Sequence, residues 1–196
     1  MDTGTAIGSL LAAFRLSGAA GLNAWLPLFA SALLARLDVV ELAAPFEDLT
    51  STTALAVLGA LTAADFVGDK IPVVDHVLHA AGTVIAPASG AILFTGQTGL
   101  ETDLPTLAAV LLGGATAGSI HAVRAAVRPA STATTAGVGN PILSLGEDLV
   151  SLALVVTAFA VPVLAVLLLL VFLLALVRWW RRLRRRRARR VAPPSE

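Results

Sequence analysis

The chain has 196 residues, of which 57% are hydrophobic and 14% are charged, whereas soluble domains carry roughly 45–50% apolar and about 25% charged residues. A soluble chain of this length has no core large enough to hide so much apolar surface, so the composition excludes an ordinary soluble domain and predicts a polytopic membrane protein. Cysteine is absent, which excludes disulfides, thiolate catalysis and cysteine metal sites.

Taken in chain order, the apolar segments predict an all-α bundle of about seven membrane spans, some of them short, broken or re-entrant. The first covers about 4–19 and is broken by the glycine-rich run 18–23, and the second covers 24–37 with Pro27 in its first turn, where proline is tolerated. An acidic loop over 38–50 precedes the third segment, 51–66. The polar turn 68–72 then leads into the fourth, 73–95, which we expect to be interrupted at Pro87.

The second half of the chain adds three more segments. An acidic loop with Glu101 and Asp103 precedes the fifth, 104–128, and a loop rich in Ser, Thr and Gly runs from Pro129 to Asn140. The apolar stretch 141–180 would form a helix of roughly 60 Å, about twice the thickness of the hydrocarbon layer. We therefore predict two helices, over 141–160 and 162–178, with Pro162 opening the last; one long kinked helix is the alternative.

Charge predicts the orientation of the chain. Nine of the fourteen basic residues lie between Arg178 and Arg190, and cytoplasmic flanks collect arginine and lysine. We expect a transmembrane domain over 1–178 and an arginine-rich cytoplasmic tail over 179–196, in a multi-pass plasma membrane protein with its N-terminus outside. The tail should contact anionic lipid headgroups rather than nucleic acid, through Arg181, Arg182, Arg184, Arg185, Arg186 and Arg187.

Two stretches resemble each other at an offset of 42 residues. In 79–91 and again in 121–133, a histidine stands eight residues before a Pro-Ala-Ser triplet. The predicted topology sends these two helices in opposite directions, which is typical of the inverted repeats of transporters. Chance similarity in an alanine-rich chain is the alternative.

Ionisable side chains gather toward the predicted cytoplasmic side. From the segment ends and a rise of 1.5 Å per residue, His79, His121, Glu147 and Asp148 should lie roughly 10–12 Å inside the membrane. Such groups cost several kcal/mol unless they are paired or face water. A candidate pathway for a solute or ion therefore consists of these residues and the polar ones near them: Asp65, Asp69, Lys70, Asp75, His79, His121, Arg124, Arg128, Asn140, Glu147 and Asp148.

Three kinds of chemistry fit this set. A divalent cation is the one cofactor that the residues suggest, through oxygen and nitrogen ligands from Asp75, His79, His121, Glu147 and Asp148, although no compact ligand motif is present. Carboxylate–histidine pairs are suited to a proton relay. Arg15, Arg124, Arg128 and the Ser/Thr loop are suited to a phosphate or another anion. A purely structural role, in which the charged residues join helices together, is the alternative for each.

Four runs of sequence resemble a known family. They are Gly21-Leu22-Asn23-Ala24-Trp25-Leu26, the run from Asp69 to Asp75 (Asp-Lys-Ile-Pro-Val-Val-Asp), Ala86-Pro87-Ala88-Ser89-Gly90-Ala91, and the run from Asn140 to Asp148. They are similar to the bacterial membrane family known as domain of unknown function 4126, over roughly 4–180. The resemblance implies a polytopic protein of a bacterial plasma membrane and implies no activity.

The leading functional hypothesis is therefore a small transporter or channel for an ion or small solute, with a polar site that faces the cytoplasm. A membrane enzyme that acts on lipid headgroups, or a structural or partner-binding subunit, is the alternative. The partners expected are membrane lipids and a small solute or ion, and a homo-oligomer is compatible with the sequence.

Overall fold

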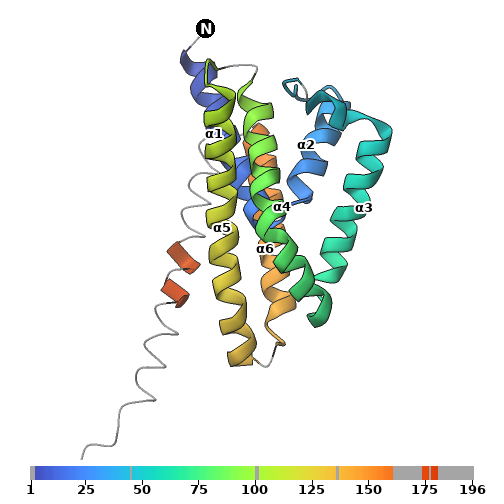
Figure 1. Cartoon of the computed structure of the whole chain (residues 1–196), viewed down its shortest axis with the longest axis vertical. Coiled ribbons are helices and arrows are strands. Elements are labelled where there is room, and N and C mark those ends of the chain that lie inside the picture. The colour runs from blue at the N-terminus through green and yellow to red at the C-terminus, as the bar shows by residue number, and fades with distance from the viewer. Residues whose placement is uncertain are drawn as a thin grey trace, which may run out of the picture.

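The structure is a computed structural model that describes residues 3–44, 46–99, 102–135, 137–160, 174–176 and 178–180. These ranges form helices joined by short turns and contain no strand (Figure 1). The elements are α1 (Thr3–Leu22), α2 (Leu26–Arg36), the short 3-10 helix η1 (Phe46–Thr50), α3 (Thr52–Gly68), α4 (Pro72–Thr98), α5 (Thr106–Thr135) and α6 (Asn140–Ala160). The predicted all-α bundle is confirmed.

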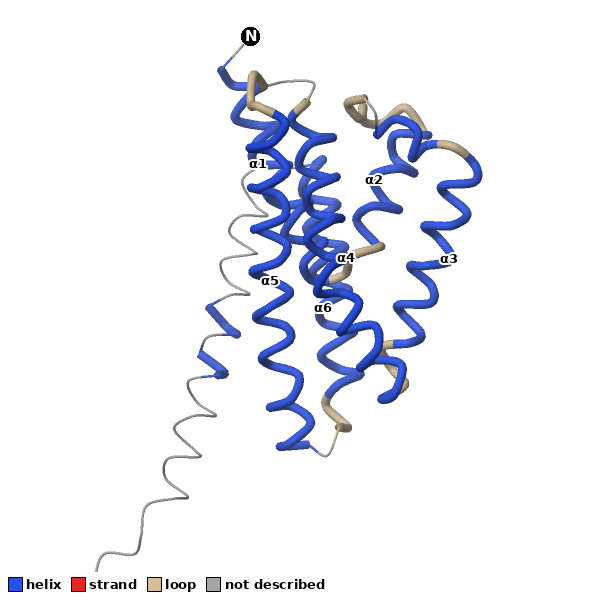
Figure 2. Tube along the Cα trace, viewed as in Figure 1, coloured by secondary structure: helices blue, strands red, loops and turns tan. Residues whose placement is uncertain are grey.

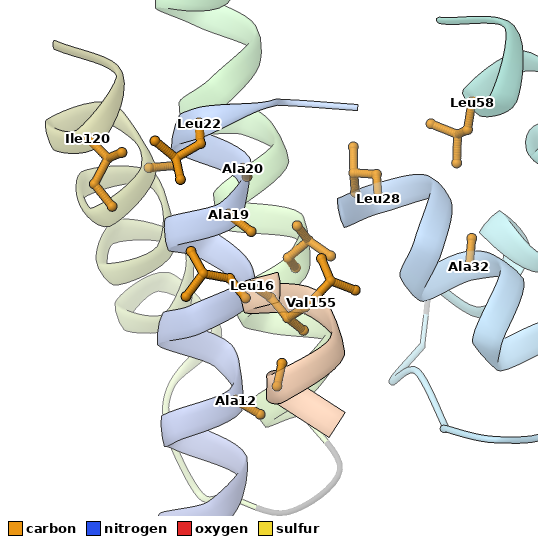
Figure 3. Packing of buried hydrophobic residues seen from close by; sticks show 14 residues of the cluster. Ala12, Leu16, Ala19, Ala20, Leu22, Leu28, Ala32, Leu58, Ile120 and Val155 are labelled. Carbon is orange, nitrogen blue, oxygen red and sulfur yellow. The ribbon is translucent and has the colours of Figure 1, made fainter. Parts of the chain in front are cut away.

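Helices α1, α4, α5 and α6 form the bundle, and α2 and α3 pack on one side of it (Figure 1). The apolar core follows α1, where Ala12, Leu16 and Ala19 are buried against Val155 of α6 and other side chains (Figure 3). Small residues let the helices approach closely, as is usual inside membranes. At the crossing of α4 and α5, a Cβ atom on Gly113 would lie 2.4 Å from the carbonyl oxygen of Gly90.

Two turns lie at the same end of the bundle. The turn from α3 to α4 and the turn from α5 to α6 are both at the lower end in Figure 2, whereas the loops that follow α2 and α4 are at the upper end. The lower turns place the start of α4, the end of α5 and the start of α6 near one another. The polar residues of those segments are therefore brought to one end of the molecule.

Three of the predicted interruptions are wrong. Helix α1 runs through Gly21, α4 runs through Pro87, and α5 continues past Pro129 to Thr135, where a loop was expected over 129–140. Proline is tolerated inside membrane helices because neighbouring helices and hydroxyl side chains satisfy the backbone groups it frees. In the last turn of α5, the hydroxyls of Thr134 and Thr135 bond to the backbone carbonyls of Ala130 and Ser131, and Gly137 follows with a φ of +88°.

The chain does break between α1 and α2, but inside the bundle. The linking residues 23–25 lie at mid-height of the bundle (Figure 2), whereas a break between two full spans at the glycine-rich run 18–23 would lie at one of its ends. Asn23 organises this break, because its Oδ1 accepts hydrogen bonds from the backbone N–H groups of Trp25 at 3.1 Å and Leu26 at 3.0 Å. Pro27 stands in the first turn of α2, as predicted.

Three of the described helices are long and apolar enough to cross a membrane: Val77–Thr98, Thr106–Thr135 and Asn140–Phe159. They indicate a membrane protein. Helices α1, α2 and α3 contribute shorter apolar stretches, and the 11 residues of α2 reach only about half-way across a bilayer at 1.5 Å per residue. The predicted helix over 141–160 is confirmed by α6. The predicted helix over 162–178 falls almost wholly outside the described residues, so the count of seven spans stays a prediction.

Candidate functional site

Five buried charged side chains form a network of ion pairs, here named the charged cluster: Asp69, Asp75, Arg124, Arg128 and Glu147. Arg124 donates from Nη2 to Asp69 and from Nε to Glu147, both at 2.7 Å. Arg128 donates from Nη2 to Glu147 at 2.7 Å and to Asp69 at 3.2 Å, and from Nη1 to Asp75. Each guanidinium therefore bridges at least two carboxylates.

Four elements supply the members of the charged cluster. Arg124 and Arg128 are four residues apart and share one face of α5. Asp69 follows the last residue of α3, Asp75 is in the first turn of α4, and Glu147 is on α6. Ser144, one turn before Glu147, adds a hydrogen bond to Oδ2 of Asp69 at 2.9 Å. The charged cluster thus joins the two turns at the lower end of the bundle.

Burial of the charged cluster has a free-energy cost that its ion pairs must offset. Two guanidinium groups and three carboxylates have left water, and each such ion costs several kcal/mol unless good geometry and further hydrogen bonds repay it. Losing one partner of a buried pair typically costs about 3–5 kcal/mol, because an uncompensated charge stays behind. We therefore expect the five side chains to act as one unit.

Two further buried carboxylates lie outside these ion pairs. Asp148 follows Glu147 on α6, and its Oδ1 accepts a hydrogen bond from Nδ2 of Asn23 at 2.8 Å. Asn23 therefore connects α6 to the break between α1 and α2. Asp65 is also buried, one turn before Asp69 on α3. The negative charge of Asp148 is among the charges that influence Asp65.

The two histidines of the repeated stretches contact each other across α4 and α5. The ring centroids of His79 and His121 are 4.9 Å apart with planes tilted by 35°, and Nε2 of His121 lies 3.3 Å from the carbonyl oxygen of His79. Gly82 makes room for this contact, since a Cβ atom there would lie 2.5 Å from Cε1 of His121. The charged cluster bonds to neither imidazole among the described contacts.

A cavity of about 520 Å³ opens beside the charged cluster, between α4 and α5. Asp75 and Arg128 form the side that it shares with the charged cluster, and Thr83 of α4 and Thr132 of α5 add hydroxyl groups. Its remaining lining residues are His79, Ala80, Ala125, Pro129, Ala133 and Asn140. The volume is in the range of small-molecule sites, and the lining offers hydrogen bonds as well as charge.

A second, smaller cavity of about 190 Å³ lies between α5 and α6. Its walls are apolar side chains, among them Ile120, Val127, Ile142 and Leu143, and it reaches Arg124 and Glu147. The charged cluster therefore has a polar cavity on one side and an apolar one on another.

The structure distributes the predicted site residues over three groups. Asp69, Asp75, Arg124, Arg128 and Glu147 form the charged cluster, Asp65 and Asp148 lie outside its ion pairs, and His79 and His121 pair with each other. Asn140 lines the larger cavity and donates to Thr132 at 2.9 Å. Lys70 is exposed, and its ammonium group lies 3.4 Å from the centroid of the Phe66 ring.

The remaining predicted roles have separate outcomes. Among the described residues, no group of three or more His, Asp or Glu side chains is placed to hold a metal ion. Arg15, proposed with Arg124 and Arg128 for an anion, is instead fully buried elsewhere and donates to the carbonyl oxygens of Thr157 at 2.9 Å and Ala158 at 3.3 Å. The tail arginines Arg181–Arg187 lie outside the described residues.

Two contacts escaped the sequence reasoning. Ser144 was not singled out, although its spacing of three residues from Glu147 on one helix is a signal that a polar face begins there. Asn23 was noted only as a neutral polar group. Its position just after a glycine-rich run and just before the Pro27 helix start indicates a capping role, but its bond to Asp148 requires knowledge of how α1 and α6 pack.

Comparisons with known proteins give a family and no activity. No curated protein matches the chain, and no solved structure does. One family model, described as Domain of unknown function (DUF4126), matches residues 10–182. That match covers most of the 196 residues and all the groups described above, so the chain belongs to the DUF4126 family.

Proposed function

We propose that this protein is a small transporter or channel of a bacterial plasma membrane, and that its solute is a small cation or a small polar molecule. The observation that carries the proposal is the charged cluster, which four helical elements build inside an apolar bundle, next to a cavity of about 520 Å³. Ionisable groups inside a membrane are expensive and typically mark solute or proton pathways.

Charge favours a cation over an anion. The charged cluster contains three carboxylates and two guanidinium groups, an excess of one negative charge, and two further carboxylates, Asp65 and Asp148, are buried nearby. Arg128, the one arginine that lines the larger cavity, already donates to three carboxylates. A guanidinium with that many partners has little capacity left to clamp a phosphate, which argues against the lipid-headgroup enzyme as well as against anion transport.

The ion pairs are suited to act as a gate. They join α3 and α4 on one side to α5 and α6 on the other, so a movement of one pair of helices relative to the other must exchange these contacts. Asn23 extends the connection to the α1–α2 break. Broken helices that meet near the middle of the membrane are typical of transporters.

The proposal also includes the orientation of the chain in the membrane and an inverted repeat within it. The arginine-rich segment after Arg178 favours a cytoplasmic C-terminus, and counting back through seven spans places the charged cluster toward the cytoplasm and the N-terminus outside. The matched stretches 79–91 and 121–133 lie on adjacent antiparallel helices, with His79 and His121 in contact where the two meet. That placement is what a local inverted repeat would require, and it supports the repeat as a hypothesis.

Flux through proteoliposomes tests the proposal. The full chain is reconstituted, and uptake is measured for protons, alkali cations, ammonium compounds and small neutral solutes against empty vesicles. Thr83→Trp, which fills the larger cavity, should abolish the flux. Ser119→Trp is the matched control at an exposed position of α5 that lines neither cavity and should leave the flux intact.

Two results would refute the proposal: no flux above empty vesicles across the panel, or equal flux from the two tryptophan variants. In the first case, the self-contained pairing of the charged cluster favours a structural or partner-binding membrane subunit, in which these ion pairs only fix the helices.

A further inference from the structure

Two deeply buried carboxylates have unsatisfied oxygen atoms. The exposed fraction is 8% for Asp65 and 6% for Asp148, so both side chains are more than nine-tenths buried. In each, Oδ2 has no hydrogen-bond partner in the part of the chain that the structure describes. A buried acceptor without a partner costs about 1–3 kcal/mol, and more when it is charged.

The surroundings do not neutralise these two carboxylates. The charged groups that influence Asp65 are those of Asp69, Arg124, Arg128 and Asp148. The charged groups that influence Asp148 are those of Asp69, Lys70 and Arg124. From the break between α1 and α2, the neutral amide of Asn23 donates to Asp148. Both guanidinium groups are already shared among the three carboxylates of the charged cluster, and the ammonium group of Lys70 is exposed and held against Phe66.

Charge balance then decides the state of the two carboxylates. If all five buried carboxylates were ionised, they would exceed the guanidinium groups of Arg124 and Arg128 by three negative charges. The third buried arginine, Arg15, lies elsewhere and bonds to carbonyl oxygens of α6. Isolated buried charges are too costly to persist, and such groups neutralise instead. Protonating Asp69, Asp75 or Glu147 would sacrifice ion pairs, whereas protonating Asp65 or Asp148 sacrifices none of the ion pairs of the charged cluster.

We propose that Asp65 and Asp148 are two proton-binding carboxylates, whose unpartnered Oδ2 atoms take up protons from water and release them when the bundle opens. Each event forms or breaks one O–H bond on a carboxyl group and needs no other reactant. The Asn23–Asp148 hydrogen bond transmits the change to the α1–α2 break. Coupling of these protons to solute movement rests on the proposed function, but their binding does not.

Infrared spectroscopy of the full chain in liposomes tests proton binding without a solute. A carboxylic acid has a C=O stretch that is distinct from that of a carboxylate and shifts in D2O. At neutral pH the wild-type protein should show this band, and Asp65→Asn or Asp148→Asn should each remove part of it. Glu41→Gln, an exposed position in the loop after α2, should leave the band unchanged.

Thermal unfolding provides a second, independent readout. Asparagine resembles a protonated aspartate in shape and charge, so Asp65→Asn and Asp148→Asn should shift the unfolding midpoint by no more than about 2 °C, which corresponds to a change of about 1 kcal/mol or less. The matched control is Asp69→Asn, which removes the negative charge that both arginines pair with and should lower the midpoint severalfold more.

Three results would overturn the inference. The band could be missing at neutral pH, it could persist unchanged in both variants, or sodium could abolish it in wild-type protein, in which case a metal cation is the ligand. A protein that keeps the band but moves no solute would refute the proposed function alone.

Discussion

Replacing Arg128 by methionine is the sharpest test of the charged cluster as a single unit. Arg128 has 4% of its surface exposed and donates to Asp69, Asp75 and Glu147. Methionine keeps much of the apolar stem but removes the charge and all three contacts. Arg124 would then be the only buried cation near three carboxylates that Arg128 had helped to neutralise.

The expected loss follows from this geometry. Breaking a buried pair by removing one partner costs about 3–5 kcal/mol, and here one side chain serves three carboxylates. For a chain of this size each kcal/mol lowers the unfolding midpoint by about 2–4 °C, so Arg128→Met should lower it by about 6–20 °C. Arg128→Lys should fall between, because lysine keeps the charge but lacks the planar fork that reaches several carboxylates at once.

The assay is tryptophan fluorescence during heating in detergent micelles, since Trp25 packs against the core. Arg36→Met is the matched control, as Arg36 is on α2 and donates to the carbonyl oxygen of Thr50 in an exposed position; its effect should be about 0.5 kcal/mol or less. Adding Asp75→Asn to Arg128→Met should recover part of the loss. An Arg128→Met protein that unfolds within about 2 °C of wild type would refute the buried ion-pair network.

Three further substitutions test the packing around the charged cluster with the same assay. Gly113→Ala should destabilise the protein by about 1–3 kcal/mol, since its Cβ would meet the backbone of Gly90. The control Gly8→Ala, with open space around it, should stabilise the protein by about 0.5–1 kcal/mol. Equal effects of the two substitutions would contradict the α4–α5 crossing. Asn23→Ala should cost about 1–3 kcal/mol, because it removes two backbone bonds of the α1–α2 break and the bond to Asp148, and an unchanged midpoint would show that the break is held in another way. Arg15→Met should cost about 1–3 kcal/mol through its bonds to the carbonyls of Thr157 and Ala158, with Arg15→Lys retaining part of the stability; a midpoint above that of wild type would mean that desolvation of Arg15 outweighs its bonds.

The helical bundle could be predicted from composition and segment length, but the continuity of the helices could not. Pro87 and Pro129 suggested breaks because proline removes a backbone donor. Inside a packed bundle that loss is local, and the helix continues when neighbours enclose it: α4 packs closely on α5 and α1, and the Pro87 ring is 3.3 Å from the position of a Cβ atom on Gly118. Whether a proline interrupts a helix therefore depends on contacts that the local sequence does not contain.

The opposite error occurred at the start of the chain. The run Gly18–Asn23 was placed at a membrane surface, where a turn needs no special partner. In the structure the chain turns inside the bundle, because Asn23 supplies the hydrogen bonds that water would supply at a surface. Asn23 satisfies two backbone donors and also bonds to Asp148, and these contacts stabilise a break inside the bundle. The bond to Asp148 can be recognised only when the position of α6 is known.

For the charged residues, the sequence predicts burial, whereas the packing of the helices determines which of them pair. Burial of charge could be predicted, because lipid offers no alternative to residues such as Arg124 and Glu147 in the middle of apolar segments. Their partners could not, because His79, His121, Glu147 and Asp148 were expected at a similar depth, whereas in the structure Glu147 pairs with both arginines and the histidines contact each other. Depth estimates count residues from assumed segment ends, so an α5 that continues seven residues beyond Arg128 shifts every estimate on that helix. Once the helix ends are corrected, both arginines lie level with Asp69 and Glu147, and the acids left without an arginine are Asp65 and Asp148. The two proposed proton-binding carboxylates are thus the buried acids that remain outside the ion pairs of Arg124 and Arg128.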